Sequence, residues 1–423
     1  MPRLVLGLLV MLATAAVGEE FPKFEELPAI KELPDPLKMR DGTPVKTADD
    51  WMKRRRPELQ ALIQHYMYGV PPAAPDNLQA KVVRSDSQVL GGKATVEEIT
   101  LTFGPGGKGR IHLLLIRPNA NKAKAPVFAG LNFNGNHTVL KDSKIALPTV
   151  WMRGTPDNKA VEADRGKEVD VWCAEQLVDR GYSLATAYYG DIDPDKDKDH
   201  EDWSDGVHPL YYKGGQKQPA PHEWGSIAAW AWGLSRIVDH LAARDDIDPK
   251  RIAAIGHSRL GKTALLAGAL DERIAIVCPH QSGTGGCALS RDNDQETVKR
   301  INENFPHWFN DNFTQFNDQE VKLPFDQHSL MALCAPRPIF DTEGIQDTWA
   351  NYDAAFRSLK GADPVYKLLG QSGLKAGRPI EQDEELTAEN AGTLNQYRRD
   401  EKHVLNRGYW EKILDFAELW YAK

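Results

Sequence analysis

The sequence predicts an α/β fold in which helices cover both faces of a doubly wound, mostly parallel β-sheet, giving three layers. From residue 125 onward, short apolar runs of strand length alternate with longer stretches of helical character. Strands that are covered on both faces form continuous apolar runs, as residues 125–133 do. No internal repeat and no linker divides the pattern. We therefore expect one domain over residues 19–423, with an N-terminal arm and an insertion at about 284–325.

Residues 1–18 are expected to form a signal peptide and not to belong to the fold. Arg3 precedes an apolar stretch that is too short to span a bilayer, and Ala16, Val17 and Gly18 fit a small-residue cleavage site. The sequence therefore predicts a secreted or periplasmic protein. No later apolar run has the length of a membrane span.

Charge and composition limit the partners. The 423-residue chain has a formal net charge of −8 and a pI near 5.9, and the absence of a basic stripe argues against binding of nucleic acid. The histidines are scattered without metal-binding spacing, so we expect no metal and no cofactor. Two of the four cysteines, Cys278 and Cys334, lie in apolar runs, where buried free thiols are expected. The sequence does not determine the oligomeric state, and a monomer is our expectation.

The chain is expected to begin with an irregular arm over residues 21–50, because this stretch is rich in Pro, Glu and Lys, and to continue as a helix from about Ala48 to Gly69. Alternation of Val, Ile and Thr predicts the first three strands, and continuous apolar runs predict the later ones. The predicted strands are residues 79–84, 94–103, 109–117, 125–133, 182–189, 252–255, 274–279 and 338–342. The further predicted helices are residues 169–179, 224–243, 263–270, 326–333, 349–359 and 409–421. The insertion, rich in Asn, Phe and Trp, is expected to line a cleft as a lid.

Ser258 lies at the most informative turn of the chain. It follows the apolar run 252–255 and Gly256, and a run with good helix propensity comes after it. A strand, a sharp turn with a serine and a helix form a nucleophile elbow, which exposes the serine oxygen above the sheet. The motif G-x-S-x-G is not met strictly, because Leu260 occupies the second glycine position and Gly261 comes one residue later. The alternative is that Ser258 is an ordinary helix N-cap.

Two cations beside Ser258 favour the elbow. Arg259 follows it directly and Lys262 comes one helical turn later. Positive side chains at a helix N-terminus oppose the helix dipole, so stability alone does not explain them. They indicate a site where an anion or an oxyanion is held.

A serine nucleophile requires a base and an acid that orients the base. In hydrolases with a nucleophile elbow, both follow the serine in chain order. His403 is the best-placed base, because it lies in a polar stretch just before the closing helix, whereas His280 comes too early and His328 opens a helix. Asp347, on the loop after strand 338–342, is the predicted acid, with Glu343 as the alternative.

The segment GHSRLGK at residues 256–262 resembles the signature of the glucuronoyl esterases, carbohydrate esterase family 15. The likeness covers most of the chain from about residue 126 onward. Further similar segments are WGSIAAWAWGLSRIVDHL at 224–241, PHQSGTGG at 279–286, NFPHWF at 304–309, LPFDQHSLMALCAPRPI at 323–339 and QDTWAN at 346–351.

The resemblance implies an α/β-hydrolase fold and cleavage of the ester between (4-O-methyl-)glucuronic acid on xylan and a lignin alcohol. The expected substrate is thus glucuronoxylan or a lignin–carbohydrate ester. Carried over to this sequence, the resemblance makes Ser258 the nucleophile and His403 the base. An acid position found in bacterial members matches Asp347.

The same resemblance implies roles for the residues around the triad. Arg259 would stabilise the oxyanion through its backbone N–H and its guanidinium. Lys262 and Trp349 would contact the uronate, and Glu296 would bind a sugar hydroxyl.

Two positions depart from the pattern of many relatives, the fungal ones especially. Gln281 stands where those relatives have a glutamate, and a neutral amide cannot stabilise an imidazolium as a carboxylate does. His257 replaces a fungal cysteine, so the disulfide formed there cannot form here. The first departure places the acid at Asp347 or leaves the enzyme impaired.

Two alternative functions stay open. An acetyl xylan esterase or another carbohydrate esterase would use the same triad, although Arg259 and Lys262 favour an acidic or heavily hydroxylated sugar. A degenerate hydrolase fold that only binds glucuronoxylan is the second alternative, suggested by Gln281.

Overall fold

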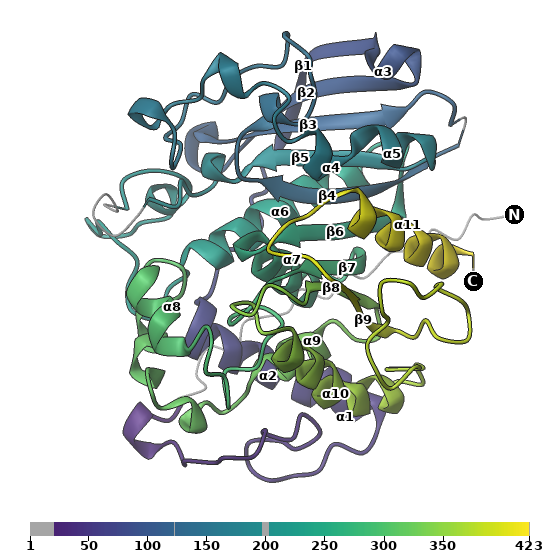
Figure 1. Ribbon diagram of the computed structural model, residues 1–423. Coiled ribbons are helices and arrows are strands. Elements are labelled where there is room, and N and C mark those ends of the chain that lie inside the picture. Colours follow the sequence, from purple (N-terminus) through teal and green to yellow (C-terminus); the bar gives the residue numbers. More distant parts are fainter. Residues whose placement is uncertain (1–20, 122, 197–202, 423) are drawn as a thin grey trace, which may run out of the picture.

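A nine-stranded sheet forms the centre of the computed structural model, which describes residues 21–121, 123–196 and 203–422 (Figure 1). The strands lie in the order β1-β2-β3-β5-β4-β6-β7-β8-β9. Their bounds are β1 Gln79–Gln88, β2 Ala94–Phe103, β3 Gly109–Pro118, β4 Ala125–Asn132, β5 Ser183–Tyr188, β6 Ile247–His257, β7 Ile274–His280, β8 Ile339–Gly344 and β9 Leu394–Arg399. The strands from β5 to β9 in this order are all parallel, whereas β1, β2 and β3 pair antiparallel at one edge, with β3 also antiparallel to β5. The predicted mostly parallel sheet is confirmed.

Helices cover both faces of this sheet, as predicted. Their bounds are α1 Ala48–Asp50, α2 Arg56–Ile63, α3 Val89–Gly92, α4 Val169–Trp172, α5 Ala174–Asp179, α6 Ser226–Ala242, α7 Arg259–Leu270, α8 Val298–Asn304, α9 Gln327–Leu333, α10 Tyr352–Leu368 and α11 Arg407–Tyr421. The larger core joins one sheet face to α2, α6, α7, α9 and α10. The smaller core joins the other face to α4, α5 and α11. Along β4, Val127 and Ala129 point into the larger core and Phe128 into the smaller one, because successive residues of a strand alternate in direction.

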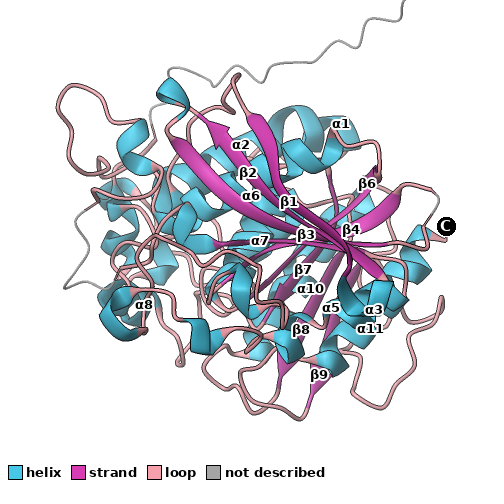
Figure 2. Cartoon of the chain, turned by 90° about the horizontal axis from the view of Figure 1, so that it is seen from above, coloured by secondary structure: helices cyan, strands magenta, loops and turns pink. Residues whose placement is uncertain are grey.

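The sheet is strongly twisted when it is viewed from above (Figure 2). All the parallel strands end at the same edge of the sheet, and the loops that follow them lie together there. The elements after β6, β7 and β8 therefore meet, although they are far apart in the chain.

Several boundaries differ from the predictions for local reasons. β9 was not predicted, because its sequence LNQYRR lacks an apolar run; its buried Asn395 and Gln396 are held by hydrogen bonds. The predicted helix 169–179 is divided into α4 and α5 at Cys173, whose φ of 45° is left-handed. The helix predicted at 349–359 begins at Tyr352 and continues to Leu368.

The cysteines are free and buried, as expected for Cys278 and Cys334, and the same is true of Cys173 and Cys287. In the described part of the chain, no helix combines the length and the apolar character needed to cross a membrane. The predicted signal peptide, residues 1–18, lies outside the described residues.

Candidate active site

Ser258 occupies a strained turn between β6 and α7. Its φ of 58° and ψ of −127° are a combination that residues with a side chain rarely adopt. Two glycines permit the turn. A Cβ on Gly256 would lie 1.9 Å from the carbonyl oxygen of Leu260, and a Cβ on Gly261 would lie 2.9 Å from that of His280. A side chain at either glycine would collide with the backbone, and Gly261 supplies this space one residue after the usual second glycine position.

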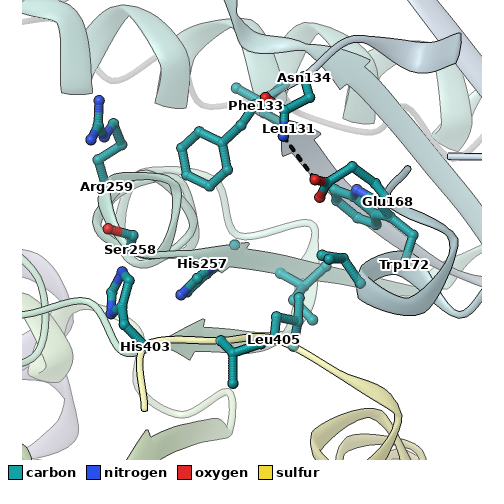
Figure 3. Close-up of a pocket in the computed structure, with 14 residues that line it drawn as sticks. Leu131, Phe133, Asn134, Glu168, Trp172, His257, Ser258, Arg259, His403 and Leu405 are labelled. Carbon is teal, nitrogen blue, oxygen red and sulfur yellow. Dashed lines mark hydrogen bonds between the residues drawn. The ribbon is translucent and has the colours of Figure 1, made fainter. Parts of the chain in front are cut away.

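His403 is paired with Asp347, as the chain order predicted. Its Nδ1 lies 2.5 Å from Oδ2 of Asp347, a carboxylate that is only 7% exposed. When the Nδ1–H group donates a hydrogen bond to this carboxylate, Nε2 carries no hydrogen and can accept a proton. His403 and Ser258 line the same cavity, and the imidazole lies against Ser258 (Figure 3). This geometry suits removal of the hydroxyl proton by Nε2.

Glu343, the alternative acid, does not contact His403. Its side chain is fully buried and neither carboxyl oxygen has a hydrogen-bond partner. Burial raises the pKa of Glu343 well above its usual value, and the nearby Asp341 raises it further. A carboxyl group that favours its neutral form is poorly suited to stabilise an imidazolium.

Gln281 lies beside the loop that carries His403. Its side-chain amide donates to the carbonyl oxygen of Lys402 at 2.8 Å and accepts from the N–H of Val404 at 2.9 Å. The position that departs from many relatives therefore holds the backbone on both sides of the imidazole.

Two further imidazole rings, those of His257 and His280, pack beside His403 in a row. The ring of His257 lies 4.4 Å from that of His403 and 4.8 Å from that of His280, measured between centroids. Burial lowers the pKa of His257 well below its usual value and that of His280 to about 3. Neither ring carries a charge that would oppose protonation of His403.

Arg259 is fixed by a buried carboxylate, Asp195. Its guanidinium forms an ion pair with Asp195 and lies 4.7 Å from the ring centroid of Trp308. Asp195 also accepts from Nε1 of Trp308 at 2.7 Å and lies 2.9 Å from Nε2 of His307. Burial alone would raise the pKa of Asp195, but the Arg259 cation and these hydrogen bonds hold it below its usual value.

The backbone N–H of Arg259 adds a second donor. It belongs to the first turn of α7, where N–H groups have no partner within the helix. An oxygen anion that forms beside Ser258 would therefore meet an N–H, a guanidinium and the positive end of the helix dipole.

Lys262 and Trp349, which are expected to contact the uronate, are joined through Glu296, which is expected to bind a sugar hydroxyl. Lys262, which is fully buried, donates from Nζ to the carbonyl oxygen of Ser282 at 2.6 Å and to Oε2 of Glu296 at 3.2 Å. Trp349 donates from Nε1 to Oε1 of the same carboxylate at 3.1 Å, and 42% of its surface is exposed. The cluster offers an indole face and a charged pair close to the start of α7.

A cavity of about 380 Å³ begins at Ser258 and His403 (Figure 3). Its walls come from the loop after β4, from α4, from the elbow and from the His403 loop. The lining side chains are mainly apolar or aromatic: Leu131, Phe133, Val171, Trp172, Val404 and Leu405. Glu168 is the acidic residue of this lining, and its Oε1 accepts from Nδ2 of Asn134 at 2.8 Å.

Sequence reasoning missed the residues that support the site. Asp195 is one of many carboxylates in an acidic loop, and nothing in the sequence distinguishes it. His307 and Trp308 belong to a segment that the family resemblance included, but no role was attached to them. Glu168 and Trp172 carry no sequence signal, because only folding brings α4 to the elbow.

Comparisons with known proteins identify the family of the chain. A family model described as glucuronyl esterase of fungi matches residues 209–370. The chain is 43% identical over 392 residues to carbohydrate esterase MZ0003 of an unknown prokaryotic organism, covering 91% of this chain and 89% of that protein. It is 30% identical to a 4-O-methyl-glucuronoyl methylesterase of Phanerochaete carnosa, covering 80% of this chain and 72% of the relative.

Solved structures show the same similarity. A promiscuous esterase of carbohydrate esterase family 15 from a marine bacterial metagenome is 42% identical, with a TM-score of 0.83 over 94% of this chain and 98% of the other. A glucuronoyl esterase from Solibacter usitatus is 37% identical, with a TM-score of 0.83 over 94% and 99% of the two chains. The chain therefore belongs to carbohydrate esterase family 15, the glucuronoyl esterases, and is a carboxylic ester hydrolase with an α/β-hydrolase fold.

Proposed function

We propose that this enzyme hydrolyses the ester between (4-O-methyl-)glucuronic acid of glucuronoxylan and a lignin alcohol. The observation that carries the proposal is the 2.5 Å contact between His403 and Asp347 beside the strained Ser258. The names of relatives, such as the 4-O-methyl-glucuronoyl methylesterase of Podospora anserina, support the acyl group. We further propose that the enzyme is exported, as residues 1–18 predict, and acts as a monomer.

The reaction begins with attack of Ser258 Oγ on the ester carbonyl carbon. Nε2 of His403 takes the hydroxyl proton, and the Asp347 carboxylate stabilises the imidazolium that forms. The carbonyl oxygen becomes an oxyanion, which the N–H and guanidinium of Arg259 stabilise. One donor of this kind is worth about 3–4 kcal/mol in the transition state.

Collapse of the tetrahedral intermediate breaks the bond to the alcohol oxygen. His403 returns the proton to that oxygen, so the alcohol leaves neutral and the glucuronoyl group stays on Ser258. Water then attacks the acyl-enzyme, with His403 again acting as base, and glucuronic acid is released.

The acyl half is proposed to bind at the cluster of Lys262, Glu296 and Trp349. The exposed indole of Trp349 can cover an apolar face of the sugar ring. The Lys262 ammonium is held within the protein by Ser282 O and Glu296, so it fixes the Glu296 carboxylate and adds a positive charge beside the sugar. Hydroxyl-rich and acidic sugars both suit such a surface.

Hydrolysis of methyl glucuronate, benzyl glucuronate and an acetylated xylo-oligosaccharide tests the proposal with the wild type, Ser258→Ala and Asp347→Ala. We expect turnover of both glucuronates, lost in Ser258→Ala and reduced by about three orders of magnitude in Asp347→Ala. Turnover of the acetylated sugar alone would instead identify an acetyl esterase. Binding of glucuronoxylan without turnover of any ester would identify a binding protein.

A further inference from the structure

The cavity beside Ser258 is not used by the acyl group in the function proposed above. We propose that it binds the alcohol half of the ester, and that it favours an aromatic alcohol with a hydroxyl group that reaches Glu168. This inference rests on the proposed function, because it assigns the second half of the same substrate. It adds a binding subsite and a polar anchor at Glu168.

The arrangement of the site separates the two halves of the ester. Lys262, Glu296 and Trp349 do not line the cavity, whereas His403 does. The leaving oxygen must lie within reach of His403 Nε2, because this nitrogen returns the proton to it. The alcohol therefore extends on the His403 side of Ser258, into the cavity, and the sugar extends toward Trp349.

The walls of the cavity indicate an aromatic alcohol. Phe133 and Trp172 provide aromatic surface, and Leu131 and Leu405 provide aliphatic surface. A volume of about 380 Å³ is enough for a substituted benzyl or phenylpropanoid group. A small alcohol such as methanol would leave most of this apolar surface in contact with water. A larger apolar group would cover it and gain binding free energy.

Glu168 supplies a polar contact across the cavity from Ser258 (Figure 3). Nδ2 of Asn134 donates a hydrogen bond to Oε1 of Glu168 at 2.8 Å, so the carboxyl group has a defined orientation. Burial raises the pKa of Glu168, a sign that its oxygens are poorly hydrated, although the Asn134 hydrogen bond opposes this effect. A hydroxyl on the distal end of the alcohol would donate a hydrogen bond to this half-buried carboxylate.

The first experiment compares kcat/KM for benzyl and methyl glucuronate, since methanol and benzyl alcohol are leaving groups of similar acidity. The wild type is expected to prefer the benzyl ester by about tenfold. Val171→Phe adds a ring to the cavity wall and is expected to reduce the benzyl-to-methyl ratio by about tenfold. Val83→Phe, the same change at a residue of β1 that is 57% exposed, is the matched control and should keep the ratio of the wild type.

The second experiment tests the anchor with the 4-(hydroxymethyl)benzyl ester, which carries a distal hydroxyl. The wild type is expected to favour this ester over the plain benzyl ester by about fivefold, the size of one net hydrogen bond. Glu168→Met keeps the length of the side chain without an acceptor, and should bring the two esters to equal kcat/KM. Inhibition of methyl ester hydrolysis by 1,4-benzenedimethanol gives an independent measure, and should weaken in Glu168→Met.

The outcomes separate this inference from the proposed function. If no glucuronate ester is turned over, the proposed function fails. If the methyl ester is turned over but the benzyl-to-methyl ratio is near one and does not respond to Val171→Phe, the proposed function stands and the alcohol subsite is overturned. If the ratio responds but the distal hydroxyl has no effect in the wild type, Glu168 is not an anchor, and the inference as stated is wrong.

Discussion

The side chain of Gln281 holds His403 in place by binding the backbone on both sides of it. One amide group donates to Lys402 O at 2.8 Å and accepts from Val404 N–H at 2.9 Å. Gln281 itself has a left-handed φ of 44° and is almost fully buried, so the surrounding residues hold its side chain in place. An amide donates and accepts in this way, whereas an ionised carboxylate can only accept, so a glutamine suits this position.

Gln281→Glu should shift the pH dependence of hydrolysis. A carboxylate at this position cannot donate to Lys402 O, and its negative charge would favour the protonated form of His403. Because the base must be neutral, the acid limb of the kcat/KM profile is expected to move to higher pH. Gln281→Ala removes the amide without adding charge, so it should lower kcat and leave the position of the limb unchanged. Equal shifts in both variants would contradict this explanation.

Asp347→Asn should reduce kcat by about three to four orders of magnitude, since the amide cannot stabilise the imidazolium and favours the wrong tautomer of His403. Glu343→Gln is the matched control, because this carboxyl lies on the same segment but does not contact His403. It should retain activity close to that of the wild type. A comparable loss in both variants, measured as single-turnover rates on methyl glucuronate, would argue that the acid is shared.

Asp195→Asn should weaken stabilisation of the oxyanion through Arg259. Removing the charge leaves the guanidinium without its ion-pair partner, and we expect kcat to fall by about 10- to 100-fold while KM changes little. Asp191→Asn is a control on the neighbouring part of the chain, where the carboxylate contacts His112 instead. Thermal unfolding of both variants separates this effect from a general loss of stability. An unchanged kcat in Asp195→Asn would contradict the role.

The buried carboxyl pair of β8 should make the enzyme less stable as pH rises. Burial raises the pKa of Asp341 to about 6 and that of Glu343 well above its usual value. In the unfolded chain both groups titrate near pH 4, so above that pH the folded state binds more protons and the free energy of unfolding falls. The loss therefore begins near pH 4 and continues through pH 6.

Glu343→Gln removes one titrating group from this pair. Urea unfolding of this variant at pH 8 should give a higher free energy of unfolding than that of the wild type, because no buried carboxyl group has to ionise at this position. The difference should shrink as the pH falls through 4, because below that pH both carboxyl groups become protonated in the folded and the unfolded states. A constant difference across this range would show that Glu343 affects stability through packing instead of titration.

The sequence by itself determined the features that depend on local chemistry and chain order. Apolar runs and glycine spacing predicted the β6–Ser258–α7 turn, because a strained elbow leaves a local pattern. Chain order predicted the pairing of His403 with Asp347, since the loops after successive parallel strands meet at one edge of the sheet. Such features need no knowledge of distant neighbours.

The tertiary structure alone decided which polar residues support that site. Asp195 looks like an ordinary loop residue until folding places it beside Arg259, and only the folded chain shows that Gln281 binds the loop of His403. The polar strand β9 forms because β8 supplies its hydrogen-bond partners, and the cavity exists because α4 approaches the elbow. Contacts between segments that lie far apart in the chain leave no periodicity in the sequence. Their energy comes from burial and pairing, which exist only once the chain is folded.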